Sequence, residues 1–250
     1  MDLMITTLIF IIGLLLGSLL NVIIIRLPRE KRLLGRPRCT RTGELLTWRQ
    51  LLPIVGWAVQ RGRARDGRSL HWVYPVIELL TGVVLALLYV KYAFTPLFFY
   101  LVFVCAVLIV TGAIDWLYHS IYTFVILGAA LLLLLLSPVA PYITWQNAGL
   151  GALAGGISFA LLFALAKIIF PGKAAPFGLG DVYLAIFIGA AFGLTRLVET
   201  LFYGIIFAGI VAVGIVIAKR LLHRSDVPEY IAYGTYLCLG AIAYVVTQGF

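Results

Sequence analysis

Long runs of hydrophobic residues dominate the pattern along the chain, and short polar or basic segments separate them. Most runs are close to the roughly 20 apolar residues that a helix needs to cross about 30 Å of hydrocarbon. Transmembrane barrel strands would alternate polar and apolar positions, and these runs do not alternate. The pattern predicts about eight transmembrane helices, the sixth short enough to be re-entrant or tilted, over 3–25, 75–90, 96–114, 120–137, 148–170, 181–194, 198–218 and 231–248.

Composition supports an all-α integral membrane protein. Of the 250 residues, 63% are hydrophobic and 12% are charged, whereas soluble domains contain about 45–50% apolar residues. We expect the first run to be a retained helix, because no basic segment precedes it and no small-residue cleavage site follows it. The three cysteines, Cys39, Cys105 and Cys238, are odd in number and indicate no disulfide framework.

The positive charge is concentrated in one loop. The chain has a net charge of +9, and the segment 26–68 contains the whole excess. Basic loops remain on the cytoplasmic side of a membrane, so this loop predicts that the N-terminus lies outside. Nucleic-acid binding is not expected. The resulting division is a first transmembrane helix (1–25), a basic, cysteine-poor cytoplasmic loop region (26–74) and a membrane-embedded core (75–250).

Three carboxylates are not explained by loops or chain ends. Glu78 lies in the entry turn of the second expected helix, Asp115 at the cytoplasmic end of the third and Asp181 at the cytoplasmic start of the sixth. A charged side chain at a membrane helix centre costs about 2.5–3.5 kcal/mol on insertion scales, so such residues usually have a function. The expected orientation places Asp115 and Asp181 at a similar depth on the same side, where they can meet.

Two aspartates in a partly desolvated site can perform acid–base chemistry. They cannot both ionise easily, so one retains a proton and the other does not. The ionised carboxylate can take a proton from a water that attacks a peptide carbonyl, while the protonated carboxyl binds the carbonyl oxygen. This reaction needs no metal, and no Cys/His cluster of suitable spacing accompanies the acids.

The residues before Asp181 leave alternatives open. Gly178 and Gly180 allow backbone φ values closed to other residues and a close approach by a substrate strand. The segment can equally be a helix-entry turn in which Asp181 caps the first amides and Asp115 is an interfacial acid. A further alternative is an ion- or proton-coupled transporter that uses Asp115 and Asp181, although broken helices in two related halves are not visible.

The motif GLGD, from Gly178 to Asp181, resembles that of the type IV prepilin peptidases, the GxGD class of membrane aspartyl proteases. An upstream aspartate, Asp115, lies at the end of another helix, as in that family. The resemblance extends along the chain through GSLLNVIIIRLPRE (17–30), YPVIELLTG (74–82) and YGTYLCLGA (233–241).

The resemblance implies a multi-pass enzyme of the bacterial inner membrane with its active site facing the cytoplasm. Asp115 and Asp181 would be the catalytic pair. The enzyme would remove the basic leader of type IV prepilins or type II secretion pseudopilins, so its partners would be the pilin transmembrane helix, the leader and the lipid bilayer. The peptidase reaction would need no cofactor. Many family members also N-methylate the new terminus with S-adenosylmethionine, which implies a second activity.

The chain departs from the family pattern in its loop and near its end. The paired cysteines of the family are reduced to RPRC (36–39) and GRARDG (62–67), and one cysteine cannot hold a tetrahedral zinc, so zinc is not expected. The PFGP-like element reads AYGT, from Ala232 to Thr235. Glu78 can support methyl transfer, orient the loop or pair with loop arginines, and these interpretations remain open.

Overall fold

The computed structural model describes residues 3–30, 52–63, 67, 69–140, 142–169, 178–221 and 232–250, without the side chains of 139 and 219–221. These residues belong to two compact units, Met1–Ala113 and Ile114–Phe250, each of which is described by itself. Most of the expected basic loop, including Cys39 and the RPRC segment, lies outside the described residues.

Helices account for nearly all of the described chain. Five of them are long and apolar enough to cross a membrane, and Thr123–Leu136 and Tyr233–Thr247 are shorter apolar helices. In the described part, β-structure is limited to one isolated bridge between Arg63 and Ser69. The expected all-α membrane fold is therefore confirmed, while the count of eight stays a prediction. The elements are α1 (Leu3–Arg26), η1 (Leu27–Arg29), α3 (Val55–Val59), α4 (Val73–Tyr92), α5 (Pro96–Tyr118), α6 (Thr123–Leu136), η2 (Ser137–Val139), α7 (Trp145–Ile169), α8 (Leu179–Leu221) and α9 (Tyr233–Thr247).

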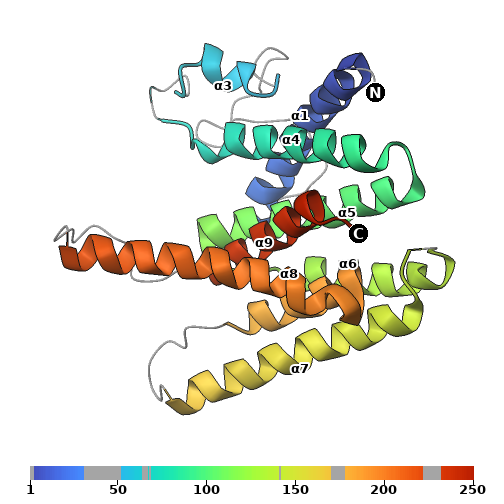
Figure 1. Cartoon of the computed structure of the whole chain (residues 1–250). Helices are drawn as coiled ribbons and strands as arrows, with labels where there is room; N and C mark the ends of the chain where they lie inside the picture. Colours follow the sequence, from blue (N-terminus) through green and yellow to red (C-terminus); the bar gives the residue numbers. More distant parts are fainter. Residues whose placement is uncertain are drawn as a thin grey trace. The chain divides into compact units, whose positions relative to one another are not determined.

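In the first unit, α1 crosses α4 at two glycines of α1 (Figure 1). A Cβ atom added at Gly13 would lie 2.7 Å from the Cα of Gly82, and one added at Gly17 would lie 2.6 Å from the Cα of Glu78. Small residues allow this close approach of the two backbones, as they do in many membrane helix pairs. Asn21 follows Gly17 by one helical turn and so lies on the same face, beside Glu78.

In the second unit, α8 packs against α6, α7 and α9 (Figure 1). Its contact with α7 is again made by small residues, since Gly151 faces Gly189 and Gly155 faces Ala185 with the backbones nearly touching. Helix α5 contributes its last turn to this unit. The unit therefore gathers the C-terminal end of α5 and the N-terminal ends of α8 and α9, which carry the candidate site.

A break at Gly193 divides α8 into two antiparallel halves. Gly193 has φ 71° and ψ 171°, a conformation that only glycine adopts readily. Before the break, the Phe192 ring lies 6.0 Å from that of Tyr244 near the end of α9, and after it Gly204 lies beside Leu237 near the start of α9. The chain thus reverses, as Figure 1 shows. The sequence-based boundary between the sixth and seventh helices, 194–198, lies just beyond this break.

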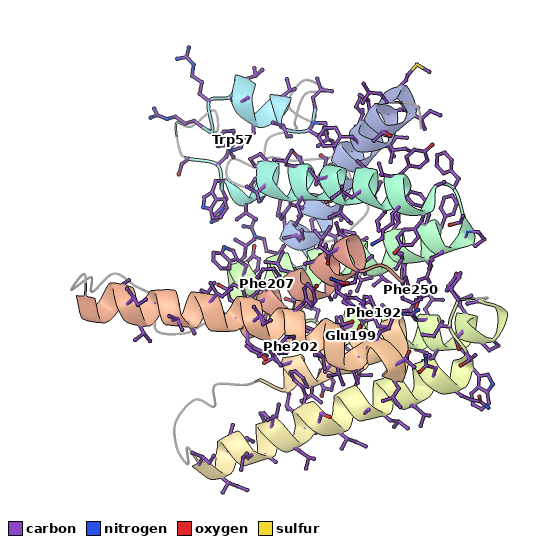
Figure 2. The ribbon with its side chains drawn as sticks, viewed as in Figure 1. Trp57, Phe192, Glu199, Phe202, Phe207 and Phe250 are labelled. Atoms are coloured by element: carbon purple, nitrogen blue, oxygen red, sulfur yellow. The ribbon has the colours of Figure 1, made fainter. Side chains whose placement is uncertain are left out.

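Asn147 of α7 stabilises the break. Its Oδ1 accepts the backbone N–H of Thr195 (3.3 Å), and its Nδ2 donates to the Thr195 hydroxyl (3.2 Å). Polar side chains commonly satisfy backbone groups that a helix break exposes in a membrane protein. The aromatic residues Phe192 and Phe250, labelled in Figure 2, pack next to the break, with their ring centroids 6.0 Å apart.

Substitutions at the break are expected to destabilise the protein. Gly193→Ala should cost about 1–3 kcal/mol, because alanine does not tolerate this backbone conformation. Its Cβ would also lie 2.5 Å from the Nδ2 of Asn147. Asn147→Ala should cost about 1 kcal/mol through the lost hydrogen bonds. Thermal unfolding in detergent measures both, with Gly149→Ala as the control, since no atom of the described chain lies within 4 Å of a Cβ there. Equal stability of Gly193→Ala and the control would contradict this account.

Candidate functional site

Asp115 lies in the last turn of α5 and is held by the first turn of α9. Its Oδ2 accepts the backbone N–H of Thr235 at 2.8 Å and the Thr235 hydroxyl at 3.1 Å. The Asp115 side chain is buried. A buried carboxylate is tolerated when it accepts hydrogen bonds, so these two donors stabilise it. The same bonds join the ends of two helices that are far apart in the sequence.

Asp181 lies in the first turn of α8 and is also buried. Its Oδ2 accepts the N–H of Gly178 at 3.0 Å, and its own N–H donates to the Gly178 carbonyl at 3.1 Å. This reciprocal pair resembles a capping box, in which the third helical residue reaches back to the residue before the helix. The capping interpretation is therefore correct in that this segment forms a helix-entry turn. The N-cap residue, however, is Gly178, and Asp181 is the third residue of the helix.

The structure brings the two aspartates together within the second unit. Their carboxyl groups interact electrostatically, although one belongs to α5 and the other to α8. Each aspartate accepts its hydrogen bonds from the described residues on its own Oδ2 atom.

Residues of α9 complete the surroundings of the pair. Tyr233 interacts electrostatically with Asp181, and Tyr236 with Asp115. Sequence analysis did not identify Tyr233, Thr235 or Tyr236 as site residues. The available signal was the departure of AYGT from the family's PFGP element, because a threonine in place of proline supplies the N–H and hydroxyl that bind Asp115.

The expected role of the motif glycines is only partly correct. Gly180 lies inside α8 without a positive φ, so the interpretation based on unusual backbone angles is wrong for this glycine. Close approach does apply at Gly180, but the approaching group is the chain's own Ile121. A Cβ at Gly180 would lie 2.8 Å from the Ile121 Cβ, whereas no atom of the described residues lies nearer than 3.8 Å to a Cβ at Gly178.

The two glycines are therefore expected to respond differently to alanine. Gly180→Ala should reduce activity by about tenfold or more, because the new methyl group pushes Ile121 or Asp181 out of place. Gly178→Ala keeps the N–H that binds Asp181 and has room for the methyl group, so it should retain most activity. Cleavage rates of the two variants, measured on equal amounts of folded protein, decide the matter. Equal loss in both variants would contradict the steric explanation.

Glu78 belongs to the first unit, where it connects α4 to the segment 52–63. Its Oε2 accepts the backbone N–H of Ile54 at 2.7 Å, and its Oε1 accepts the Asn21 side-chain amide at 3.4 Å. The Ser18 side chain also donates to it. Ile54 has φ 58°, which is unfavourable for a β-branched residue. The contacts favour the loop-orienting interpretation, while the arginines of 31–51 lie outside the described residues.

Glu78→Gln is expected to loosen this segment. The carboxylate accepts from Asn21 on one oxygen and from Ile54 on the other. In a glutamine, one of these two oxygens is replaced by an NH₂ group, which would face a donor instead of accepting from it. The buried donors left unpaired should lower the free energy of unfolding by about 1–3 kcal/mol. Hydrogen exchange at the Ile54 amide should become faster than in the wild type. Glu30→Gln is the control, and unchanged exchange in Glu78→Gln would exclude this role.

Within the described ranges, no group of three or more His, Cys, Asp or Glu residues is arranged to hold a metal ion. Cys105 and Cys238 are buried thiols that form no disulfide in the described part of the chain, and Cys39 lies outside these ranges.

Comparisons with known proteins match both parts of the chain. Residues 11–92 match the Bacterial Peptidase A24 N-terminal domain, and residues 102–213 match the Type IV leader peptidase family. The second match includes Asp115 and the whole GLGD motif. No solved structure matches the chain.

Several curated relatives carry the name prepilin leader peptidase/N-methyltransferase. The Klebsiella pneumoniae protein is 32% identical over 77% of this chain and 87% of its own length. The Bacillus subtilis protein is 26% identical over 89% of this chain and 88% of its own length. The Myxococcus xanthus protein is 30% identical over 72% of this chain, which spans 54% of that relative. With both parts matched in order, the chain belongs to the type IV leader peptidase family.

Proposed function

We propose that the chain is a membrane-embedded aspartyl endopeptidase that removes the leader of type IV prepilins or type II secretion pseudopilins. The observation that carries the proposal is the paired, buried carboxyl groups of Asp115 and Asp181, each held at a helix end by hydrogen bonds that the described residues make to its Oδ2. Both lie in the region that matches the Type IV leader peptidase family. The relatives' names supply the substrate class.

The proposed reaction is a general acid–base hydrolysis. The ionised carboxylate takes one proton from a water as its oxygen attacks the peptide carbonyl carbon. The protonated carboxyl donates its hydrogen bond to the carbonyl oxygen and stabilises the charge that develops there. The C–N bond then breaks as the carboxyl that took the water proton passes it to the departing amine nitrogen, and the water oxygen remains in the new carboxyl group. Thr235 and Gly178 hold the Oδ2 atoms during these steps.

The proposed setting is the bacterial inner membrane, with the N-terminus outside and the site facing the cytoplasm. The basic segment 26–68 supports this orientation through the positive-inside tendency. The aspartates lie in terminal turns of their helices. The proposed orientation puts these turns near the cytoplasmic surface, where the basic leader of a prepilin would approach them. The pilin's apolar helix would remain in the lipid.

A second activity, N-methylation of the new terminus with S-adenosylmethionine as methyl donor, is part of the proposal. The relatives' names support it. Glu78 would act in it by orienting the segment 52–63, through its bond to Ile54. The peptidase reaction needs neither this donor nor zinc.

The experiment that tests the proposal combines the purified full chain with a prepilin in liposomes. Mass spectrometry should detect the pilin without its leader, and a 14 Da increase at the new terminus only when S-adenosylmethionine is added. Absence of any cleaved product would refute the peptidase. The same liposomes can be assayed for cation or proton uptake, since uptake without cleavage would favour a transporter that uses Asp115 and Asp181.

A further inference from the structure

We propose that the side chain of Ile121 sets the size of the substrate residue accepted beside the bond that is cut. The proposal rests on the proposed peptidase function and concerns the same site. Ile121 lies in the linker between α5 and α6, and neither its position in the sequence nor the GLGD motif points to it.

Ile121 bridges the helix ends that carry the two aspartates. A Cβ added at Gly180 would lie 2.8 Å from the Ile121 Cβ, and one added at Gly234 would lie 2.9 Å from its Cδ1. Gly180 directly precedes Asp181, and Gly234 directly precedes Thr235, which binds Asp115. The isoleucine side chain therefore occupies the space between the N-terminal ends of α8 and α9, which two glycines leave open.

The linker is accessible and is not part of either helix. His119 and Ser120 are exposed and Ile121 is half-buried, so a peptide can reach this segment. His119 has φ 50°, which directs the chain away from the axis of α5. Outside the helices of the described chain, no backbone hydrogen bond involves the N–H or carbonyl of Ser120 or Ile121. An extended peptide can therefore lie against this segment without displacing a helix.

A peptide bound for cleavage must contact Ile121. Its carbonyl group has to reach both carboxyls, and Ile121 touches the glycine next to Asp181 and the glycine next to the Asp115-binding threonine. The side chain of one of the two substrate residues that flank the scissile bond then points toward this isoleucine. A large side chain there collides with Ile121, so the wild-type enzyme favours a small residue.

The test is a change of specificity in variants of Ile121. The substrates are prepilins in liposomes that carry Gly, Ala or Leu at each of the two positions flanking the cut, and kcat/KM is measured for each. Ile121→Ala should raise the Leu-to-Gly ratio at one position by about tenfold or more, since each methylene in an apolar pocket changes discrimination about tenfold or more. Ile121→Val should shift the ratio in the same direction by less. Ile157→Ala, on an exposed face of α7, is the control.

Loss of stability cannot produce this result, because unfolded enzyme lowers every rate by the same factor and leaves the ratio unchanged. If Ile121→Ala does not fold, the ratio is read from Ile121→Val. Ratios equal to those of the wild type at both flanking positions would overturn the role of Ile121 while leaving the peptidase intact. Failure of the wild-type enzyme to cleave any of these prepilins would instead refute the proposed function itself.

Discussion

Asp115→Asn and Asp181→Asn, each made alone, are expected to abolish leader removal while the protein remains folded. Asparagine has nearly the same size as aspartate but cannot take a proton from water or donate one to the departing amine. Such acid–base steps contribute about 10²–10⁴-fold each, so either variant should lose at least that factor. The remaining amide oxygen can still accept the bonds from Thr235 or Gly178, which preserves the local fold.

The measurement is the time course of prepilin cleavage in liposomes, with thermal unfolding to establish that each variant is folded. Glu199→Gln is the matched control, since Glu199 is an acidic residue of the same helix as Asp181. It lies beyond the break, where its carboxylate accepts the Tyr244 hydroxyl at 2.8 Å, and Figure 2 labels it. A glutamine can accept the same bond, so this variant should cleave normally. A cleavage rate above one tenth of wild type in either aspartate variant would contradict the paired mechanism.

Hydrophobic patterning predicts the helices and the positions of the acids in them, for a physical reason. A membrane helix must satisfy its own backbone hydrogen bonds and present apolar side chains to lipid. The first and last residues of such a helix can therefore be predicted from a continuous run of hydrophobic residues. Asp115 and Asp181 were thus placed correctly in terminal turns. The boundary expected after 194 is also nearly correct, because Thr195 and Arg196 interrupt the hydrophobic run just after the Gly193 break.

Local patterns do not predict the contacts that build the site. Thr235 binds Asp115 across 120 positions of sequence, and Ile121 meets Gly180 and Gly234 from a linker with no helical period. The glycines were assigned to unusual φ angles because a sequence shows only that a side chain is absent. The structure shows which atoms fill the space, and at Gly180 these belong to Ile121.

The same limit applies to Glu78, where the sequence left several interpretations open. Its hydrogen-bond partner Ile54 lies 24 positions away in a segment without a clear period. A positive φ at a β-branched residue cannot be read from the residue types, because propensity alone would disfavour it. The fold imposes this conformation, and the Glu78 carboxylate is one of the groups that stabilise it.

Gly234→Ala is expected to inactivate the enzyme by about 10²-fold, because it displaces the carboxyl group of Asp115. The added Cβ would lie 3.0 Å from Oδ2 and 3.3 Å from Cγ of Asp115, and 2.9 Å from Cδ1 of Ile121. The carboxyl cannot yield without weakening its bonds to Thr235. Misplacement of a catalytic group by about 1 Å can cost about 10²-fold in rate.

Gly209→Ala, in the second half of α8, is the control for this variant, because none of the described residues places an atom within 4 Å of a Cβ there. Both variants replace a helical glycine by a better helix former, so intrinsic helix propensity changes in the same direction in each. Rates of prepilin cleavage and unfolding temperatures are compared for the two. A steric effect at the site requires that Gly234→Ala lose activity at a temperature where it is fully folded. Wild-type activity in folded Gly234→Ala would show that α9 can shift without moving Asp115, and the arrangement of the pair would then not depend on this glycine.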